Sequence, residues 1–267
     1  PEMGVRGAAW ATVIGQLFSM GTALAFHLHF DAEIDNKLRY FKPDGRTILG
    51  IYSIGLPAII SQALLTVMTY SLNLILGGIP QVGQNAVTVY GLYYKIQQLI
   101  IFAAFGVRDA ITPIVSFNYG AQNRQRVKDG IRWGLIYTAV IMLAGCLFVE
   151  ALAPQLAGLF SLSETTLPMC IDCMRIVSLG FVFAGLCIAF QGVFQALECG
   201  IESLIISLCR QVIFILPPVW ALSRMVTGSG NVRIVWLPLA LGEAVTLVIA
   251  LLLFRRAKKQ KVDTITA

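Results

Sequence analysis

Long uninterrupted apolar segments constrain the fold of this chain more than any other feature of its sequence. A helix needs roughly 20 residues to cross the ~30 Å hydrocarbon core of a bilayer. Segments of at least that length occur at residues 7–30, 47–78, 83–116, 131–153, 168–197, 201–226 and 233–254. Only helices and closed barrels satisfy their backbone hydrogen bonds in lipid, and these segments lack the alternation of barrel strands. The sequence therefore predicts an all-α integral membrane protein with seven transmembrane helices.

Composition agrees with a membrane protein, and the missing motifs argue against an enzyme. Hydrophobic residues make up 57% of the chain and charged residues 13%, against about 25% charged in a soluble domain. The motifs of zinc proteases, serine hydrolases, P-loop ATPases and dinucleotide-binding enzymes are absent from the sequence. His27 and His29 sit at the end of an apolar segment without a ligand cluster, and the six cysteines read as free thiols. We therefore expect no catalytic site, no bound metal, no cofactor and no nucleic acid partner.

Basic residues alternate between the connecting segments and so predict the orientation. Segments 31–46 and 121–132 carry four Lys or Arg each and the tail after residue 254 carries five, whereas the opposite side has Arg6, Arg224 and Arg233. Basic loops face the cytoplasm, and this rule also explains the net charge of +6. The prediction is a multi-pass protein of the cytoplasmic membrane whose first residues lie outside and whose tail is cytoplasmic.

The first and last apolar segments resemble each other. Val5-Arg6 matches Val232-Arg233, Gly15 matches Gly242 and Gln16 matches Glu243, at a constant shift of 227 residues. Both copies run inward, as expected for a parallel repeat of six-helix units. The chain also opens on Pro1 rather than Met, and we expect it to be a piece of a longer chain. The predicted organisation is the last helix of an otherwise missing first lobe at 1–30, a cytoplasmic lobe-connecting linker at 31–46, a second six-helix lobe at 47–254 and a basic cytoplasmic tail at 255–267.

Seven stretches, in order, resemble one family. They are GVRGAAWATVIGQ at 4–16, GLPAIISQ at 55–62, QNAVTVYGLYYKIQQ at 84–98, RDAITPIVSFNYGAQN at 108–123, FQGVFQALECG at 190–200, SLCRQVIFILPPVW at 207–220 and WLPLALGEAVT at 236–246. Together they resemble the second half, helix 6 to helix 12, of a transporter of the multidrug and toxic compound extrusion (MATE) family. The resemblance implies one lobe of a two-lobed, twelve-helix fold that exports cationic amphipathic compounds in exchange for H⁺ or Na⁺.

The chain departs from one branch of that family. In that branch a Glu in helix 7 and an Asp in helix 10 form a Na⁺ site in the second lobe. Here residues 47–78 contain no carboxylate, and the one carboxylate within 168–197 is Asp172, which we expect to pair with Arg175 one turn away. A second-lobe Na⁺ site of this type is not supported, and the coupling ion stays open between H⁺ and Na⁺.

Three charged residues fall well inside apolar segments: Lys95, Arg210 and Glu243. A charge at mid-bilayer costs about 2.5–3.5 kcal/mol on insertion scales, so such residues face the bundle interior and find partners. We predict that Glu243 pairs with Arg210 or with Lys95. The pair could serve packing alone or take part in transport.

Polar and aromatic residues on three of the segments are candidates to line a cavity for organic cations. Aromatic faces attract desolvated cations by up to about 2 kcal/mol, although Gln, Thr and Asn also bond membrane helices to one another. The candidates are Gln62, Thr66, Tyr70, Asn73, Tyr90, Tyr94, Lys95, Gln98, Phe190, Gln191, Phe194 and Gln195, with Gln97 beside them.

The predicted function is therefore part of a secondary-active multidrug efflux antiporter, with the bilayer, the first lobe and cationic small molecules as partners. A flippase of lipid-linked saccharides from the same export superfamily is the alternative, but its groove would need several Lys or Arg for a pyrophosphate. A seven-helix receptor is the alternative from a different class, and the internal repeat argues against it.

Overall fold

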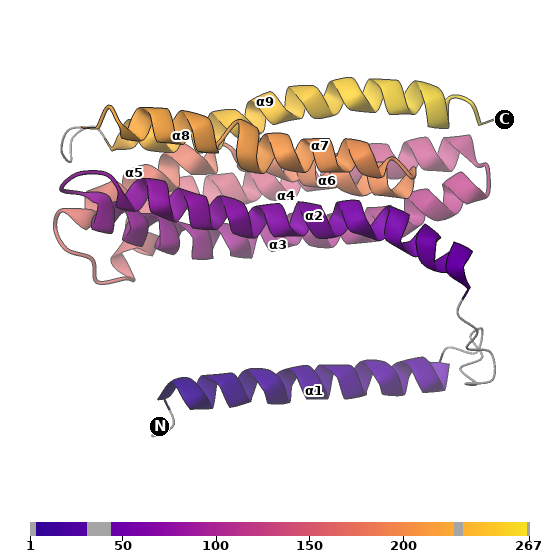
Figure 1. Cartoon of the computed structure of the whole chain (residues 1–267), viewed down its shortest axis with the longest axis horizontal. Helices are drawn as coiled ribbons and strands as arrows, with labels where there is room; N and C mark the ends of the chain where they lie inside the picture. Colours follow the sequence, from indigo (N-terminus) through magenta and orange to yellow (C-terminus); the bar gives the residue numbers. More distant parts are fainter. Residues whose placement is uncertain (1–3, 31–43, 227–231, 266–267) are drawn as a thin grey trace. The chain divides into compact units, whose positions relative to one another are not determined.

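The computed structural model describes residues 4–30, 44–226 and 232–265, and within them the regular structure is entirely helical (Figure 1). The prediction of an all-α chain is confirmed. The elements are α1 (Gly4–Phe30), α2 (Gly45–Gly77), α3 (Gly83–Gly120), α4 (Arg124–Gly158), α5 (Thr166–Ser178), α6 (Phe181–Ala196), α7 (Gly200–Leu208), the π-helical segment η2 (Cys209–Ile213), α8 (Leu216–Ser223), α9 (Arg233–Ala257) and the π-helical segment η4 (Lys258–Val262).

Within the described residues, six helices are long and apolar enough to cross a membrane, and a bent helix pair makes seven if it counts as one span, in the order that the sequence predicts. Six are single helices or continuous helix runs: Ala9–His29, Gly45–Gly77, Gly83–Gly120, Arg124–Gly158, Gly200–Ser223 and Arg233–Val262. The candidate for the seventh is the pair α5 and α6, which together are long and apolar enough but are bent by 48°. The bend falls at Leu179-Gly180, which contains no proline, the residue that most often bends a helix.

Helix α4 begins at Arg124 rather than at residue 131 as predicted. The side chain of Asn123 accepts a hydrogen bond from the backbone N–H of Arg126 at 3.1 Å and so caps the helix. The helix therefore continues beyond its apolar segment, because a helix needs lipid-compatible side chains only where it is in lipid.

The chain divides into two units, Pro1–Leu49 and Gly50–Ala267. The first contains α1, whose apolar side chains such as Trp10 and Phe18 are exposed. Most of the predicted linker, residues 31–43, lies outside the described residues. At its end, Asp44 accepts hydrogen bonds from the backbone N–H and the hydroxyl of Thr47 at 2.9 and 2.8 Å, and α2 begins there.

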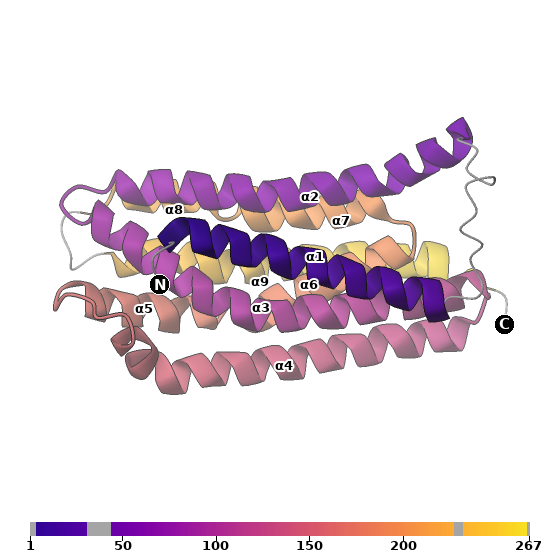
Figure 2. The ribbon, with the colours of Figure 1, turned by 90° about the horizontal axis from the view of Figure 1, so that it is seen from below.

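Helix α6 is the centre of the second unit. It packs against α3, α4, α7 and α9, and most of its residues are buried. Figure 2 shows α2, α7 and α8 on one side of this unit and α4 on the other, with α3, α6 and α9 between. A side chain at Gly185 would overlap Met142 of α4, and one at Gly192 would overlap Arg108 of α3. These glycines allow the close helix approach that small residues provide in membranes.

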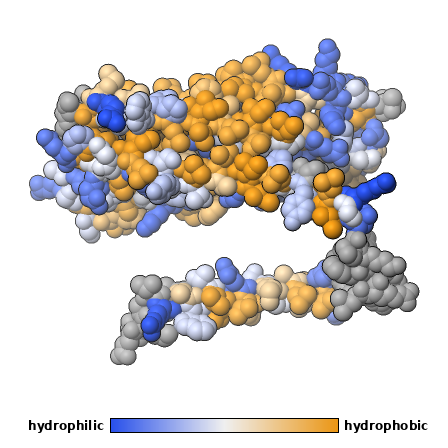
Figure 3. Space-filling view, viewed as in Figure 1, coloured by the Kyte–Doolittle hydropathy of each residue, from blue (hydrophilic) through white to orange (hydrophobic). Residues whose placement is uncertain are grey.

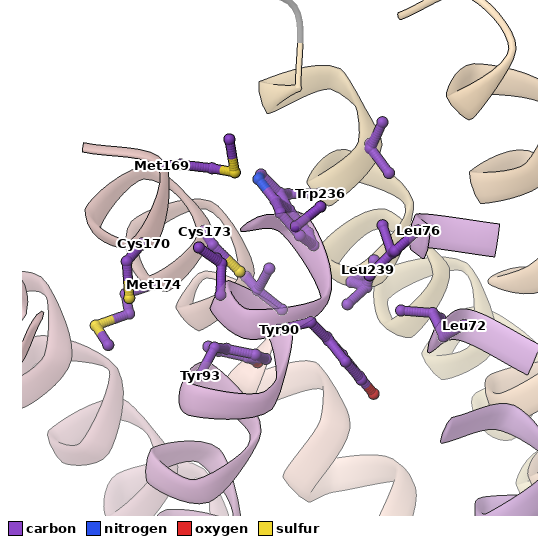
Figure 4. Close-up of a cluster of buried hydrophobic side chains, with 14 of the residues drawn as sticks. Leu72, Leu76, Tyr90, Tyr93, Met169, Cys170, Cys173, Met174, Trp236 and Leu239 are labelled. Carbon is purple, nitrogen blue, oxygen red and sulfur yellow. The ribbon is translucent and has the colours of Figure 1, made fainter. Parts of the chain in front are cut away.

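Apolar side chains form both the core and the lateral surface of the second unit. The larger part of the core gathers Tyr90 and Tyr93 of α3, Met174 of α5 and Trp236 of α9 (Figure 4). Figure 3 shows hydrophobic residues over the middle of one face of this unit and hydrophilic residues gathered toward its ends. That distribution is expected for helices that cross a bilayer.

Asp263, which follows η4, forms ion pairs with two residues at the start of α4. Asp263 accepts a hydrogen bond from Arg124 at 2.7 Å and lies 3.4 Å from Lys128 Nζ. The hydrogen bond from Arg124, together with Lys128, lowers the pKa of the Asp263 carboxyl below its ordinary value of 3.8. The stability that this carboxylate adds to the folded state is therefore fully present above pH 3.8, and it is lost as the pH falls through the lowered pKa.

Replacing Asp263 by Asn removes this attachment. A spin label introduced by Lys259→Cys is expected to become more mobile at neutral pH in Asp263→Asn, and to reach that mobility in the unmutated tail only in strong acid. Asp129→Asn is the matched control, because Asp129 accepts hydrogen bonds from its helical neighbour Gln125. Equal label mobility with and without Asp263→Asn at neutral pH would refute the attachment.

Candidate functional site

A polar cavity of about 210 Å³ lies inside the second unit, between α2, α3, α6, α7, η2 and α9. Polar side chains are unusual inside a membrane helix bundle, and they commonly mark the path of a substrate or ion. The polar and charged residues that line it are Ser61, Gln62, Tyr90, Tyr94, Gln97, Gln98, Arg108, Gln191, Gln195, Ser203, Ser207, Arg210, Gln211 and Glu243.

The strongest interaction in this cavity joins Arg210 of η2 to Glu243 of α9. Arg210 Nε lies 2.8 Å from both carboxylate oxygens. The two side chains are 12% and 9% exposed. Desolvation of two charges in such a place costs several kcal/mol and is offset only by close pairing. The structure thus forms one of the two predicted pairs, whereas Lys95 is exposed on α3 and does not line the cavity.

A break in the helix that contains Arg210 places this side chain at the cavity. Pro217 and Pro218 have no backbone N–H, so the carbonyls of Ile213 and Phe214 lose their helical partners. The chain adopts a π-helical turn here, with a hydrogen bond from Phe214 N–H to Cys209 O at 3.0 Å. Such π turns are frequent at functional sites. Gly242 lets α9 approach this break, since a Cβ there would lie 2.9 Å from the Phe214 carbonyl oxygen.

Paired amides and hydroxyls connect α6 to α7 along the cavity. Gln191 Nε2 donates to Ser207 Oγ at 2.7 Å, and Gln195 Nε2 donates to Ser203 Oγ at 3.3 Å. The two glutamines are four residues apart on α6 and the two serines are four residues apart on α7, so the two hydrogen bonds form in register. The two glutamines therefore bond helices together and also line the cavity.

Two tyrosines of α3 form the aromatic wall. The rings of Tyr90 and Tyr94 are 6.0 Å apart between centroids. Gln98 Nε2 donates to Tyr94 OH at 2.6 Å, and Tyr90 OH contacts Met68 Sδ at 3.8 Å. A ring face and amide oxygens together suit the cationic end of an amphipathic molecule.

The structure brings eight of the sequence candidates to this cavity, namely Gln62, Tyr90, Tyr94, Gln98, Gln191, Gln195, Arg210 and Glu243, with Gln97 as well. The other candidates lie elsewhere. Thr66, Tyr70, Asn73 and Lys95 are exposed or half-buried away from the lining. Phe190 and Phe194 are buried in the second part of the apolar core, because Gln191 and Gln195 occupy the face of α6 that lines the cavity and each phenylalanine, one residue earlier, points to the neighbouring face.

Sequence reasoning missed Ser203, Ser207 and Gln211 on the opposite wall. The signal for the serines was available: their spacing of four residues repeats that of Gln191 and Gln195.

The structure also tests the ion pair that the sequence predicted for Asp172. Asp172 pairs with Arg233 at 2.6 Å, so the expected pairing with Arg175 is wrong. Arg233 is the first residue of α9, 61 residues after Asp172 and beyond the span Gly200–Ser223, so an argument from spacing within one helix does not find it. Among the described residues no three His, Cys, Asp or Glu side chains form a group that could hold a metal ion, and the six cysteines are free and buried.

Several known proteins are similar to this chain. The MatE family model matches residues 57–220. Multidrug export protein MepA of Staphylococcus saprophyticus is 25% identical over 253 residues, which cover 94% of this chain and 54% of that protein. MepA of Staphylococcus aureus strain MRSA252 is 23% identical over 98% of this chain and 56% of that protein. The chain thus spans little more than half the length of these relatives.

Solved structures show the same fold. A multidrug resistance MATE family transporter of the MOP superfamily matches in an outward-facing conformation with a TM-score of 0.87 at 24% identity, over 98% of this chain and 58% of that one. An inward-facing conformation of a multidrug resistance MATE family transporter of the MOP superfamily matches with a TM-score of 0.75 at 24% identity, over 99% of this chain and 60% of that one. A MOP superfamily transporter of Pyrococcus furiosus, described by a reversed polarity of its binding pocket, matches with a TM-score of 0.85 at 25% identity, over 96% and 57%.

Proposed function

The chain belongs to the MatE family, and from that premise we propose that it forms the second lobe of a secondary-active multidrug efflux antiporter. The observation that carries the proposal is the cavity inside the lobe, which combines tyrosine rings, amides and one buried ion pair. The multidrug export proteins to which the chain is similar support the same assignment.

The proposed organisation keeps the order of the sequence. Residues 1–30 supply the last helix of a first lobe and 31–46 link the lobes on the cytoplasmic side. Residues 47–254 are the second lobe, and the basic tail 255–267 is cytoplasmic. The missing first lobe supplies the other wall of the transport path, which opens to each side of the membrane in turn.

The proposed substrates are cationic amphipathic compounds. Their aromatic parts fit the Tyr90 and Tyr94 rings, and Gln62, Gln97 and Gln98 accept or donate hydrogen bonds at the edge of the cavity. Because the cavity of about 210 Å³ is smaller than the 300–1,000 Å³ of most drug sites, the second lobe holds one end of such a molecule and the first lobe the rest.

The proposed coupling ion is H⁺ or Na⁺. Within the described residues that line the cavity, Glu243 is the one carboxylate, and Arg210 occupies both its oxygens. Ion binding in this lobe would have to displace Arg210, which favours a coupling site in the first lobe.

A lipid-linked saccharide flippase is the second candidate, since Arg108 and Arg210 both line the cavity. Arg108, however, bonds Asp109 at 2.7 Å and Arg210 bonds Glu243. A pyrophosphate would find the charge of both arginines already compensated, so efflux of organic compounds is the better proposal.

Accumulation of a fluorescent cationic dye in cells tests the proposal. Cells that express this chain joined to its first lobe are expected to retain several-fold less dye than cells with an empty vector, and cells with this chain alone to retain as much as the vector control. Equal retention in all three, with the two-lobed protein present in the membrane, would refute dye efflux.

A further inference from the structure

Glu150 of α4 is a carboxylate inside a membrane helix that does not line the polar cavity. It is the one charged residue between Arg132 and Glu164. It lies within the candidate span Arg124–Gly158 and is half-buried. No salt bridge among the described residues includes it. A carboxylate without an opposite charge is costly in a membrane helix, and such residues commonly serve a function.

The partner of Glu150 is a hydroxyl at the bend between α5 and α6. Ser178 Oγ lies 2.7 Å from Glu150 Oε1 and 2.9 Å from the backbone carbonyl oxygen of Arg175, in donor geometry to both. Ser178 is fully buried and is the last residue of α5, directly before Leu179-Gly180. A hydroxyl has a single proton, so it donates to only one of these two oxygens at a time.

The charge on Glu150 decides which oxygen receives that proton. An ionised carboxylate accepts hydrogen bonds and cannot donate, so Ser178 donates to it and the Arg175 carbonyl loses this bond. A protonated carboxyl group donates to Ser178 Oγ instead, and the hydroxyl then turns to the Arg175 carbonyl. This carbonyl is one of the last four of α5, which lack intrahelical partners of their own. A hydrogen bond gained or lost there acts directly on the bend.

The titratable groups of α4 and α5 leave the Glu150 carboxyl group available. On α4, Cys146 lies one turn away and interacts electrostatically with Glu150, and thiols ordinarily keep their proton below about pH 8. On α5, Asp172 pairs with Arg233, and the side chain of Arg175 is exposed. Glu150 can therefore take up a proton without breaking an ion pair.

The other elements that pack against α4 are α3, α6 and η4. A Cβ at Gly145 of α4 would overlap Ile100 of α3, and about one turn further along these antiparallel helices Lys95 reaches the level of Glu150. The Lys95 side chain is exposed, and within the described residues no ion pair joins it to Glu150. Helix α6 has one titratable side chain, the thiol of Cys187, and η4 lies at the opposite end of α4.

We propose that Glu150 is a proton-binding site of the second lobe, and that Ser178 couples its protonation to the bend between α5 and α6. With Glu150 ionised, Ser178 ties α5 to α4 by donating to the carboxylate. When Glu150 takes up a proton from water, the Ser178 O–H bond stays intact and reorients to the Arg175 carbonyl, which stabilises the last turn of α5 in a different geometry. The switch does not depend on which compound the cavity holds.

Distances between spin labels test the switch in the purified two-lobed protein. One label is placed by Pro168→Cys at the exposed start of α5 and one by Val140→Cys at an exposed position of α4. The six native cysteines are buried and react poorly. Since α5 is about 20 Å long, a change of roughly 10° in the bend moves its start by about 3 Å. We expect a shift of this size between about pH 8 and pH 4, the range in which protein carboxyl groups take up protons.

Three variants assign the shift to its cause. In Glu150→Gln the uncharged amide donates to Ser178 Oγ as a protonated carboxyl group does, so the label distance should stay at its acid value at every pH. Ser178→Ala keeps the carboxyl group but removes the relay, so the distance should no longer depend on pH. Glu164→Gln is the matched control, because this carboxylate is exposed just before α5, and it should shift as the wild type does.

Infrared difference spectra show whether Glu150 itself takes up the proton. The band of protonated carboxyl groups that grows on acidification should be as large in Ser178→Ala as in the wild type and smaller in Glu150→Gln. Equal bands in the wild type and Glu150→Gln, a wild-type distance that ignores pH, or a Ser178→Ala protein that shifts like the wild type would overturn the switch. Loss of the shift in Lys95→Gln or Asp172→Asn with the Glu150 band intact would also overturn it, because an ion pair would then control the bend.

Discussion

Replacing Glu243 by Gln is expected to lower the free energy of unfolding by about 3–5 kcal/mol, because it leaves the Arg210 charge buried without its partner. The two side chains are only 12% and 9% exposed, so water cannot take over the role of the carboxylate. Titration of the purified protein from a mild detergent into a denaturing one measures the loss.

Two comparisons make this result specific. The double variant Arg210→Gln/Glu243→Gln should recover most of the lost stability, because it removes both charges. Asp172→Asn should cost less than about 1 kcal/mol, because its partner Arg233 is exposed. If Glu243→Gln were as stable as the wild type and exported dye equally well, the pair would have neither a packing nor a transport role.

Replacing Gly242 by Ala is expected to destabilise the lobe by about 1–3 kcal/mol, as overpacking does elsewhere. The new methyl group would lie 2.9 Å from the Phe214 carbonyl oxygen and 3.3 Å from Ile215 Cγ1. The carbonyl belongs to the backbone of the helix break and cannot rotate away. Displacing α9 from this break would also separate Glu243 from Arg210, so dye binding should weaken as stability falls.

Gly106→Ala in α3 is the control, since a Cβ at Gly106 meets nothing within 4 Å. Alanine there should be neutral or slightly stabilising, as its helix propensity predicts. The thermal midpoint of both variants in detergent decides the matter. A Gly242→Ala protein with the midpoint of Gly106→Ala would show that α9 does not need this close approach.

The sequence predicted the seven candidate spans because a bilayer sets a minimum length for each apolar segment. That length can be counted directly, without knowing which face of a helix is buried. The sequence predicted the ends less well. Helix α4 starts at Arg124 and α9 runs on through Arg255 and Arg256 to Ala257, because charged residues can continue a helix in water. The break before Pro217 could be predicted because proline has no backbone N–H to continue the helix. The bend at Leu179-Gly180 contains no proline from which it could be predicted.

The candidate site was predictable in part for a related reason. Arg210 and Glu243 could be paired in advance because an unpaired charge in lipid is costly. The choice between Arg210 and Lys95 depended on which faces of α3 and α9 meet, and this is a property of packing. Phe190 and Phe194 illustrate the same point: both are suitable cavity residues by type, and both face the core.

Transport by reconstituted protein under separate ion gradients tests the central claim most directly. Vesicles that contain this chain joined to its first lobe are loaded with a cationic dye and exposed to a H⁺ gradient or a Na⁺ gradient in turn. We predict that dye movement follows one of the two gradients and stops when an ionophore removes it, and that this chain alone moves no dye. Correctly folded two-lobed protein that moves no dye under either gradient would contradict the account.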